Sequence, residues 1–157
     1  MKPSLLRTLL ASPTGGVALN LGMLLTFRLL GFGWNSGGIL LDPSVQSAKL
    51  IAVRTQLEPL PLIVAHPLPV AIELVLFSIG YAFIYRWLAP SWPVGVTARA
   101  LRMATLFFSL SYLFWEFFTQ FNMFGEPLKL IGLELTFGET IALAQSFALA
   151  AVFEWKS

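Results

Sequence analysis

The sequence predicts an all-α membrane protein: a four-transmembrane-helix bundle with a short amphipathic helix in its outer loop. Three observations predict this fold class. Of 157 residues, 57% are hydrophobic and only 11% are charged, whereas a soluble domain carries about 25% charged residues. Four apolar stretches are each long enough to cross a hydrocarbon core about 30 Å thick. Prolines separate these stretches, at boundaries where a missing N–H costs least.

The predicted spans are residues 16–33, 68–89, 98–121 and 128–153, in one integral membrane domain over 1–157. Pro13 and the Gly15-Gly16 pair predict a turn before the first span, with an interfacial lead-in ahead of it. This lead-in does not resemble a signal peptide, because no small-residue cleavage site is followed by a polar mature start. We therefore expect it to be retained. Pro67, Pro90 and Pro127 mark the other boundaries.

The long outer loop, residues 34–67, contains the predicted amphipathic helix. Asp42 is its expected N-cap and Pro43 its first helical residue, while Glu58-Pro59 is its expected stop. Leu50, Val53 and Leu57 recur on one face of this helix. The segment is therefore expected to lie on the outer membrane surface or to cap the bundle, although an ordered linker without function is the alternative.

Lysine and arginine in the flanks predict the orientation. With a cytoplasmic N-terminus, six of these residues lie inside and three lie outside. Since positive residues favour the cytoplasmic side, we expect a multi-pass protein with both termini in the cytoplasm. The inside set is Lys2, Arg7, Arg86, Arg99, Arg102 and Lys156, and the outside set is Lys49, Arg54 and Lys129.

Composition also excludes several function classes. The net charge of +2 comes from few residues, so nothing indicates a nucleic-acid partner. The absence of cysteine excludes thiolate chemistry and disulfides. The sequence has no nucleophile elbow, phosphate loop or paired-histidine zinc motif. The lipid bilayer is the expected partner, with membrane-protein subunits or a homo-oligomer as further candidates.

A layer of charged side chains inside the spans is the main functional signal. Counted from the predicted boundaries, Arg28, Glu73, Glu116 and Glu134 lie roughly 9–10 Å below the outer surface, and Glu139 lies deeper. Ionisable groups in hydrocarbon are costly and usually face a bundle interior or one another. The candidate ligand site or polar network is Arg28, Glu73, Tyr112, Glu116, Gln120, Glu134 and Glu139.

Helical periodicity and charge refine this layer. Tyr112, Glu116 and Gln120 are spaced by four residues and share one helical face. Arg28 is the expected partner of Glu116 or Glu73. Because one arginine cannot balance four carboxylates, some must be protonated or bound to a cation. Three interpretations stay open: a structural hydrogen-bonded network, a cation, metal or proton site, and a docking surface for another subunit or a lipid head group.

A divalent cation is the one cofactor that the residues suggest. Carboxylates with an imidazole suit a hard or borderline ion, which makes His66, Glu116 and Glu134 candidate metal ligands. The Glu-x-x-His pairs of di-iron bundles are absent. His66, beside a proline at an interface, is also typical of a solvated anchor.

Four short motifs carry a resemblance. Leu57 to Pro61, Tyr85 to Pro90, Phe114 to Phe118 and Phe124 to Pro127 together resemble a group of small bacterial multi-pass membrane proteins of unknown function. This resemblance implies a four-helix protein of the bacterial inner membrane. It implies no reaction.

The leading hypothesis is a non-enzymatic membrane protein whose buried acidic site, near the periplasmic side, binds a cation or proton. The second is a structural accessory subunit of a larger respiratory, photosynthetic or transport complex. A membrane-embedded enzyme is the third.

Overall fold

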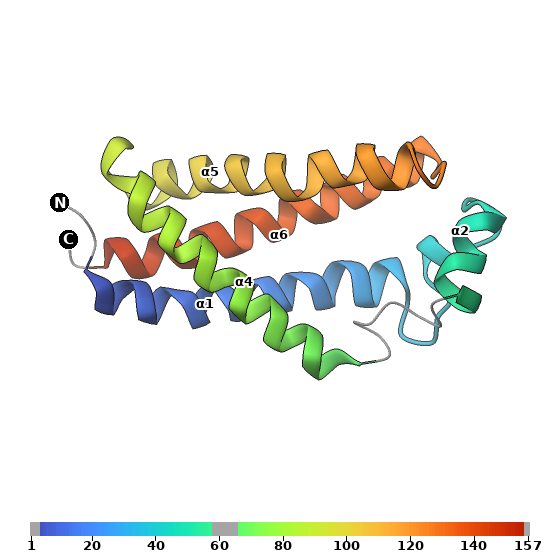
Figure 1. The fold of residues 1–157 in the computed structure, drawn as a ribbon, viewed down its shortest axis with the longest axis horizontal. Coiled ribbons are helices and arrows are strands. Elements are labelled where there is room, and N and C mark those ends of the chain that lie inside the picture. Colours follow the sequence, from blue (N-terminus) through green and yellow to red (C-terminus); the bar gives the residue numbers. More distant parts are fainter. Residues whose placement is uncertain (1–3, 58–65, 156–157) are drawn as a thin grey trace.

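The computed structural model describes residues 4–57 and 66–155, and within these ranges the protein has five α-helices, four of them long, and no strand. The long helices are α1 (Leu5–Met23), α4 (Pro67–Leu88), α5 (Val96–Phe107) and α6 (Leu128–Glu154). The short helix α2 (Ala48–Ala52) lies at the end of the molecule opposite the termini (Figure 1). The all-α prediction is confirmed.

Several helices continue into wider π-helical turns. η1 (Leu24–Gly31) prolongs α1, and η3 (Val53–Leu57) prolongs α2. η5 (Phe108–Leu113) and η6 (Glu116–Phe121) extend α5 into one helical run from 96 to 121. Two 3₁₀ turns, η2 (Ile39–Leu41) and η4 (Ala89–Ser91), complete the set. Wider turns of this kind often mark functional sites, because they turn side chains away from the regular helical positions.

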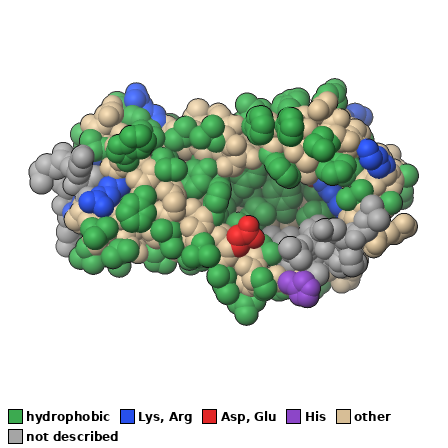
Figure 2. Space-filling view, in the orientation of Figure 1, with side chains coloured by type: hydrophobic (Ala, Val, Ile, Leu, Met, Phe, Trp, Pro, Cys, Tyr) green, Lys and Arg blue, Asp and Glu red, His purple; other side chains and the backbone are tan. Residues whose placement is uncertain are grey.

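Three helices are long and apolar enough to cross a membrane: Leu5–Gly31, Pro67–Ser91 and Leu128–Glu154. The run from 96 to 121 is the fourth long helical segment and is not among these three. In Figure 2 hydrophobic side chains cover the length of the molecule, whereas Lys and Arg gather toward its two ends. This distribution is the one expected of helices that contact lipid.

The first helix begins eleven residues earlier than the prediction of 16, at Leu5, and passes through Pro13. The hydroxyls of Ser12 and Thr14, the residues on either side of the proline, donate to the carbonyls of Thr8 and Leu10 in the preceding turn. Prolines are tolerated inside membrane helices where such polar side chains and neighbouring helices satisfy the local backbone groups. The predicted turn at Pro13 and Gly15-Gly16 was therefore wrong.

Glycines allow α1 to approach its neighbours closely. A Cβ on Gly16 would lie 3.0 Å from the Val75 Cα of α4, and one on Gly22 would lie 3.4 Å from the Ile141 Cα of α6. Small residues at crossings let backbones approach and gain van der Waals contact, which is a main source of association between membrane helices. Helix α1 therefore packs against both α4 and α6.

The four long helices are joined at the end that carries the termini (Figure 1). Arg99 of α5 forms an ion pair with Glu154 of α6, and the Tyr85 hydroxyl of α4 donates to the same carboxylate at 3.4 Å. The Tyr85 ring stacks on Phe153, and the Arg7 guanidinium of α1 donates to the Phe153 carbonyl. Each long helix thus has a polar or aromatic contact here.

At the opposite end α4 diverges from the α5 run. Its buried residues are Ser78, Tyr81, Ala82 and Tyr85, and none from Pro67 to Phe77 is buried. The diagonal course of α4 is visible in Figure 1, and Figure 2 shows this face hollowed, with hydrophobic side chains on its floor. The bundle is thus closed at the terminal end and more open at the other.

The helix in the outer loop starts later than predicted. Its N-cap is Ser47, whose hydroxyl accepts from the Leu50 N–H. Asp42 instead forms a tight turn in which its carboxylate accepts from the Ser44 N–H at 2.8 Å. An aspartate side chain forms such a turn as readily as it caps a helix. The expected stop at Glu58-Pro59 lies outside the described residues.

Two glycines of α6 give a matched test of the packing. A Cβ on Gly138 would lie 2.4 Å from the Tyr112 ring, whereas one on Gly132 would meet nothing within 4 Å. We expect Gly138→Ala to lower the stability by about 1–3 kcal/mol through overpacking. Gly132→Ala should be neutral or stabilise by roughly 0.5–1 kcal/mol. Thermal unfolding in detergent, followed by tryptophan fluorescence, measures both, and equal midpoints would contradict this packing.

Candidate functional site

Three buried carboxyl groups meet at the end of the molecule that carries α2. Glu116 lies at the start of η6, Glu126 in the connection after it, and Glu134 in the second turn of α6. One oxygen from each can be chosen so that all three lie within 4.8 Å of one another. We call these three residues the acidic cluster.

The backbone around Gly125 brings Glu126 to the other two. Gly125 has a φ of +67°, a conformation that glycine adopts without steric cost. The Glu126 N–H donates to the Gln120 carbonyl at 3.0 Å, and Pro127 follows as the N-cap residue of α6. This turn folds the end of η6 back toward the start of α6, so Glu126 falls between their glutamates.

The outer loop supplies the cation and amide that contact the acidic cluster. The Arg54 Nη2 lies 3.2 Å from the Glu134 Oε1 and 3.7 Å from the Glu126 Oε1. The Gln46 side-chain amide donates to the same Glu126 oxygen. The Arg54 guanidinium also lies 5.5 Å from the centre of the Phe32 ring. The outer segment therefore caps the bundle through its polar side chains.

Several polar atoms at this end have no hydrogen-bond partner within the described part of the chain. They are the Glu116 Oε2, the Glu126 Oε2, the Gln120 Oε1 and the Arg54 Nη1. Buried polar atoms are nearly always hydrogen-bonded in native proteins. Carboxylate and amide oxygens left in this state are the donor set of a hard cation or of bound protons.

The net charge of the acidic cluster also favours a bound cation or bound protons. Three carboxylates and the one guanidinium that pairs with them sum to −2 if all are ionised. One divalent ion or two protons would neutralise this charge. Oxygens on opposite sides of a Ca²⁺ ion are about 4.6–5.2 Å apart, twice a metal–oxygen distance of 2.3–2.6 Å. The spacing of the acidic cluster is therefore compatible with a single ion.

Glu126 lies outside the long helices, and its surroundings disfavour its charge. Burial raises the pKa of this carboxyl, and repulsion by Glu134 raises it further, whereas Arg54 and the hydrogen bond from Gln46 act in the opposite direction. Desolvation is the largest of these effects. Glu126 therefore holds its proton to a higher pH than an exposed glutamate does.

The structure brings together part of the predicted layer. Glu116 and Glu134 meet as expected, and Gln120 lies one turn after Glu116. Tyr112 lies one turn before Glu116, but its hydroxyl contacts the Met23 sulfur at 3.9 Å rather than a carboxylate. Its ring packs against Gly138. Tyr112 thus supports the helix packing below the acidic cluster.

Other predicted residues lie elsewhere. Arg28, the expected partner of Glu116 or Glu73, donates instead to the carbonyls of Gly33 and Trp34 at the end of its own helix. Glu73 is exposed on α4, and Glu139 is half-buried on α6 outside the acidic cluster. Arg28 and Glu73 were predicted at the same depth as Glu116 and Glu134, but counting residues along the chain gives only a depth and not the direction in which a side chain points.

His66, the histidine proposed as a metal ligand, is exposed and precedes α4 as its N-cap residue. The group of metal-ligating side chains found among the described residues is Glu116, Glu126 and Glu134. His66 is not part of it. The third carboxylate instead comes from Glu126, in the connection before α6.

Sequence reasoning missed Glu126 and Arg54. Both were treated as flanking residues, because neither lies in a predicted span. A signal for Arg54 was present: it follows Leu50 by four residues, so the two share one helical face, and Leu50 is 1% exposed. Glu126 carried no comparable periodic signal, since it lies in a turn.

Comparison with known proteins adds no assignment. No protein-family model, no curated protein and no solved structure matches this chain. The functional interpretation therefore depends on the residues themselves.

Arg54 and Arg28 provide a comparison of two arginines at the same end. Arg54→Leu should lower the free energy of unfolding by about 3 kcal/mol near neutral pH, because it leaves two buried carboxylates without their counter-charge. Arg28→Leu removes hydrogen bonds to two carbonyls and should cost about 1 kcal/mol. Thermal midpoints at equal detergent concentration measure both. Adding Glu134→Gln to Arg54→Leu should recover part of the loss, and absence of recovery would contradict the pairing.

The Glu126 carboxyl predicts the sign of a pH effect. Between the unfolded pKa near 4.5 and the raised folded value, the folded protein retains a proton that the unfolded chain releases. Stability should therefore fall as pH rises through this window, and Glu126→Gln should make the fall shallower. The measurement is the thermal midpoint from about pH 4 to pH 8, with a chelator present.

Asp42→Asn is the control for this experiment. Hydrogen bonds from Ser44 lower the pKa of Asp42, so its contribution has the opposite sign. The Asp42 variant should retain the fall in stability with rising pH. An unchanged pH profile in Glu126→Gln would contradict the assigned environment of Glu126.

Proposed function

We propose that this chain is a non-enzymatic integral membrane protein whose acidic cluster binds a hard cation, with protons as the competing occupants. The observation that carries the proposal is the meeting of three buried carboxylates within 4.8 Å, opposite one guanidinium. Oxygen-only ligands favour Ca²⁺, Mg²⁺ or Mn²⁺ over softer ions. With Arg54 counted, the acidic cluster has a charge of −2 when all three carboxylates are ionised, which suits a divalent ion.

The proposal includes a topology. The helical run from 96 to 121 is taken as a fourth span beside the three candidate spans. Positive flanking residues favour cytoplasmic termini, which would place the acidic cluster near the periplasmic surface of a bacterial inner membrane. The bacterial inner membrane is proposed because four short sequence motifs resemble those of small bacterial multi-pass membrane proteins. An ion would then reach the site from the outer aqueous phase.

Divalent cations should stabilise the purified protein. After chelation and dialysis, a divalent ion at about 100 times its Kd should raise the free energy of unfolding by about 2.7 kcal/mol. The increase should disappear in Glu116→Gln and in Glu134→Gln. Thermal midpoints across a titration with Ca²⁺, Mg²⁺ and Mn²⁺ measure the effect.

Glu139→Gln is the matched control, because Glu139 lies on the same helix as Glu134 but outside the acidic cluster. It should retain the full response. A response that survives in Glu134→Gln would contradict the site. A thermal midpoint that does not change with any of the three ions but changes with pH would indicate that protons occupy the acidic cluster.

A role as an accessory subunit is the second candidate. Phe114, Trp115, Phe117 and Phe118 are all more than 40% exposed, and Phe114 stacks on Phe118. An aromatic surface of this density suits packing against partner helices as well as against lipid. Mild solubilisation followed by mass analysis would separate these roles, since a lone monomer or homodimer would oppose the subunit role.

A further inference from the structure

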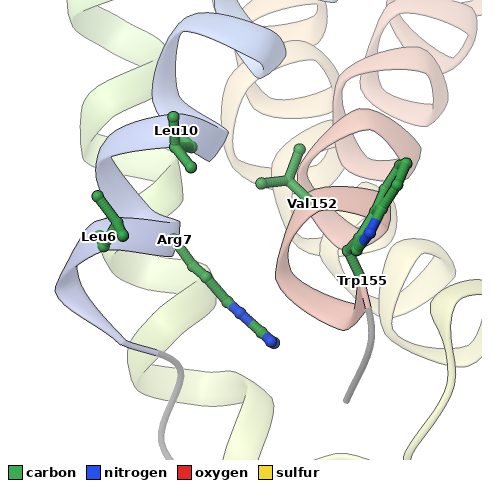
Figure 3. A pocket seen from close by; sticks show the side chains of 5 residues that line it. All are labelled: Leu6, Arg7, Leu10, Val152 and Trp155. Atoms are coloured by element: carbon green, nitrogen blue, oxygen red, sulfur yellow. The ribbon is translucent and has the colours of Figure 1, made fainter.

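A pocket lies at the end that carries the termini. It has a volume of about 500 Å³ and lies between the start of α1 and the end of α6. Its lining residues are Leu6, Arg7, Leu10, Val152 and Trp155. Figure 3 shows Arg7 extending from α1 into the space between the two helix ends, with Trp155 across from it. The pocket is separate from the acidic cluster.

The lining combines apolar walls with a single guanidinium. Leu6 and Leu10 are 66% and 55% exposed, so the apolar wall is open to the surroundings. Arg7 uses its Nη1 to donate to the Phe153 carbonyl at 2.7 Å. A guanidinium has five N–H donors, so it can hold this carbonyl and an anion together. Such chemistry suits an amphiphile with a negative head and an apolar tail.

The net positive charge at this end favours an amphiphile with a negatively charged head group. The charged residues that the structure describes in the outermost two turns of the long helices here are Arg7, Arg86, Arg99, Arg102 and Glu154, a sum of +3. The acidic member pairs with Arg99. Anionic lipids concentrate beside such basic ends of membrane helices. Trp155, 67% exposed at the helix end, is typical of the head-group level.

We propose that this pocket binds one anionic phospholipid from the leaflet at the terminal end. Arg7 holds the phosphate, and one acyl chain lies along Leu6, Leu10 and Val152, with Trp155 beside the glycerol region. The inference depends on the chain's spanning the bilayer, which the proposed function also requires, and not on any ion at the acidic cluster. The lipid site and the ion site can therefore fail separately.

Quenching of Trp155 fluorescence tests this proposal. The full chain, with Trp34, Trp87, Trp92 and Trp115 replaced by Phe, is placed in phosphatidylcholine nanodiscs. Increasing fractions of bromine-labelled phosphatidylglycerol, or of bromine-labelled phosphatidylcholine, are then added. We expect an apparent affinity for phosphatidylglycerol about fivefold higher than for phosphatidylcholine. Equal quenching by the two lipids would overturn the proposal, because it indicates ordinary annular lipid.

Variants connect the preference to Arg7. Arg7→Gln should abolish it, whereas Arg102→Gln, which removes a cation from α5 at the same end, should leave it intact. Equal losses in both variants would overturn the site in favour of diffuse attraction. If Arg7→Gln does not fold, Leu10→Phe tests the site instead, because the larger side chain occupies the space proposed for the acyl chain and leaves Arg7 in place. Unchanged binding in Leu10→Phe would also overturn the proposal, as would concentration-dependent protection of Trp155 by a second copy of the chain.

Discussion

The close contact of α1 with α4 and α6 is the constraint on which the rest of the structure depends. Glycines at 15, 16 and 22 let the α1 backbone approach both neighbours, so side chains of α4 and α6 occupy the volume that a Cβ would take. In lipid no hydrophobic effect drives helices together, and such close packing supplies much of the attraction. Helix α6 is thereby held between α1 and α5, and its polar residues Glu134, Gln145 and Ser146 are buried.

The burial of α6 has different consequences at its two ends. Near Glu154 the four long helices contact one another through a paired charge, a tyrosine and an arginine. Near Glu134 the helices supply acids, and the compensating charge comes from the outer loop. One end is thus balanced within the bundle, while the other depends on a connecting segment. This difference explains why the candidate ion site lies at the α2 end.

Much of the helical architecture follows from hydropathy and proline positions, because length and apolar composition directly reflect the thickness of a bilayer. The start of the first helix did not follow from them, since the helix continues through Pro13, where the hydroxyls of the flanking Ser12 and Thr14 donate to carbonyls of the preceding turn. In the site, the helical face on which Glu116 lies was predictable from the helical period, which places it with Tyr112 and Gln120. The partners Arg54 and Glu126 were not predicted, because they depend on how the outer loop folds over the bundle and on a turn at Gly125.

The position of Arg54 in a connecting segment has an evolutionary consequence. Substitutions that would alter the charge of the acidic cluster by changing a bundle helix must also preserve tight helix contacts, so few of them are tolerated. A change in the loop that carries Arg54 meets fewer such restrictions, because loops accept substitutions and insertions more readily. A substitution in this segment would therefore change the charge of the acidic cluster while the long helices stay the same.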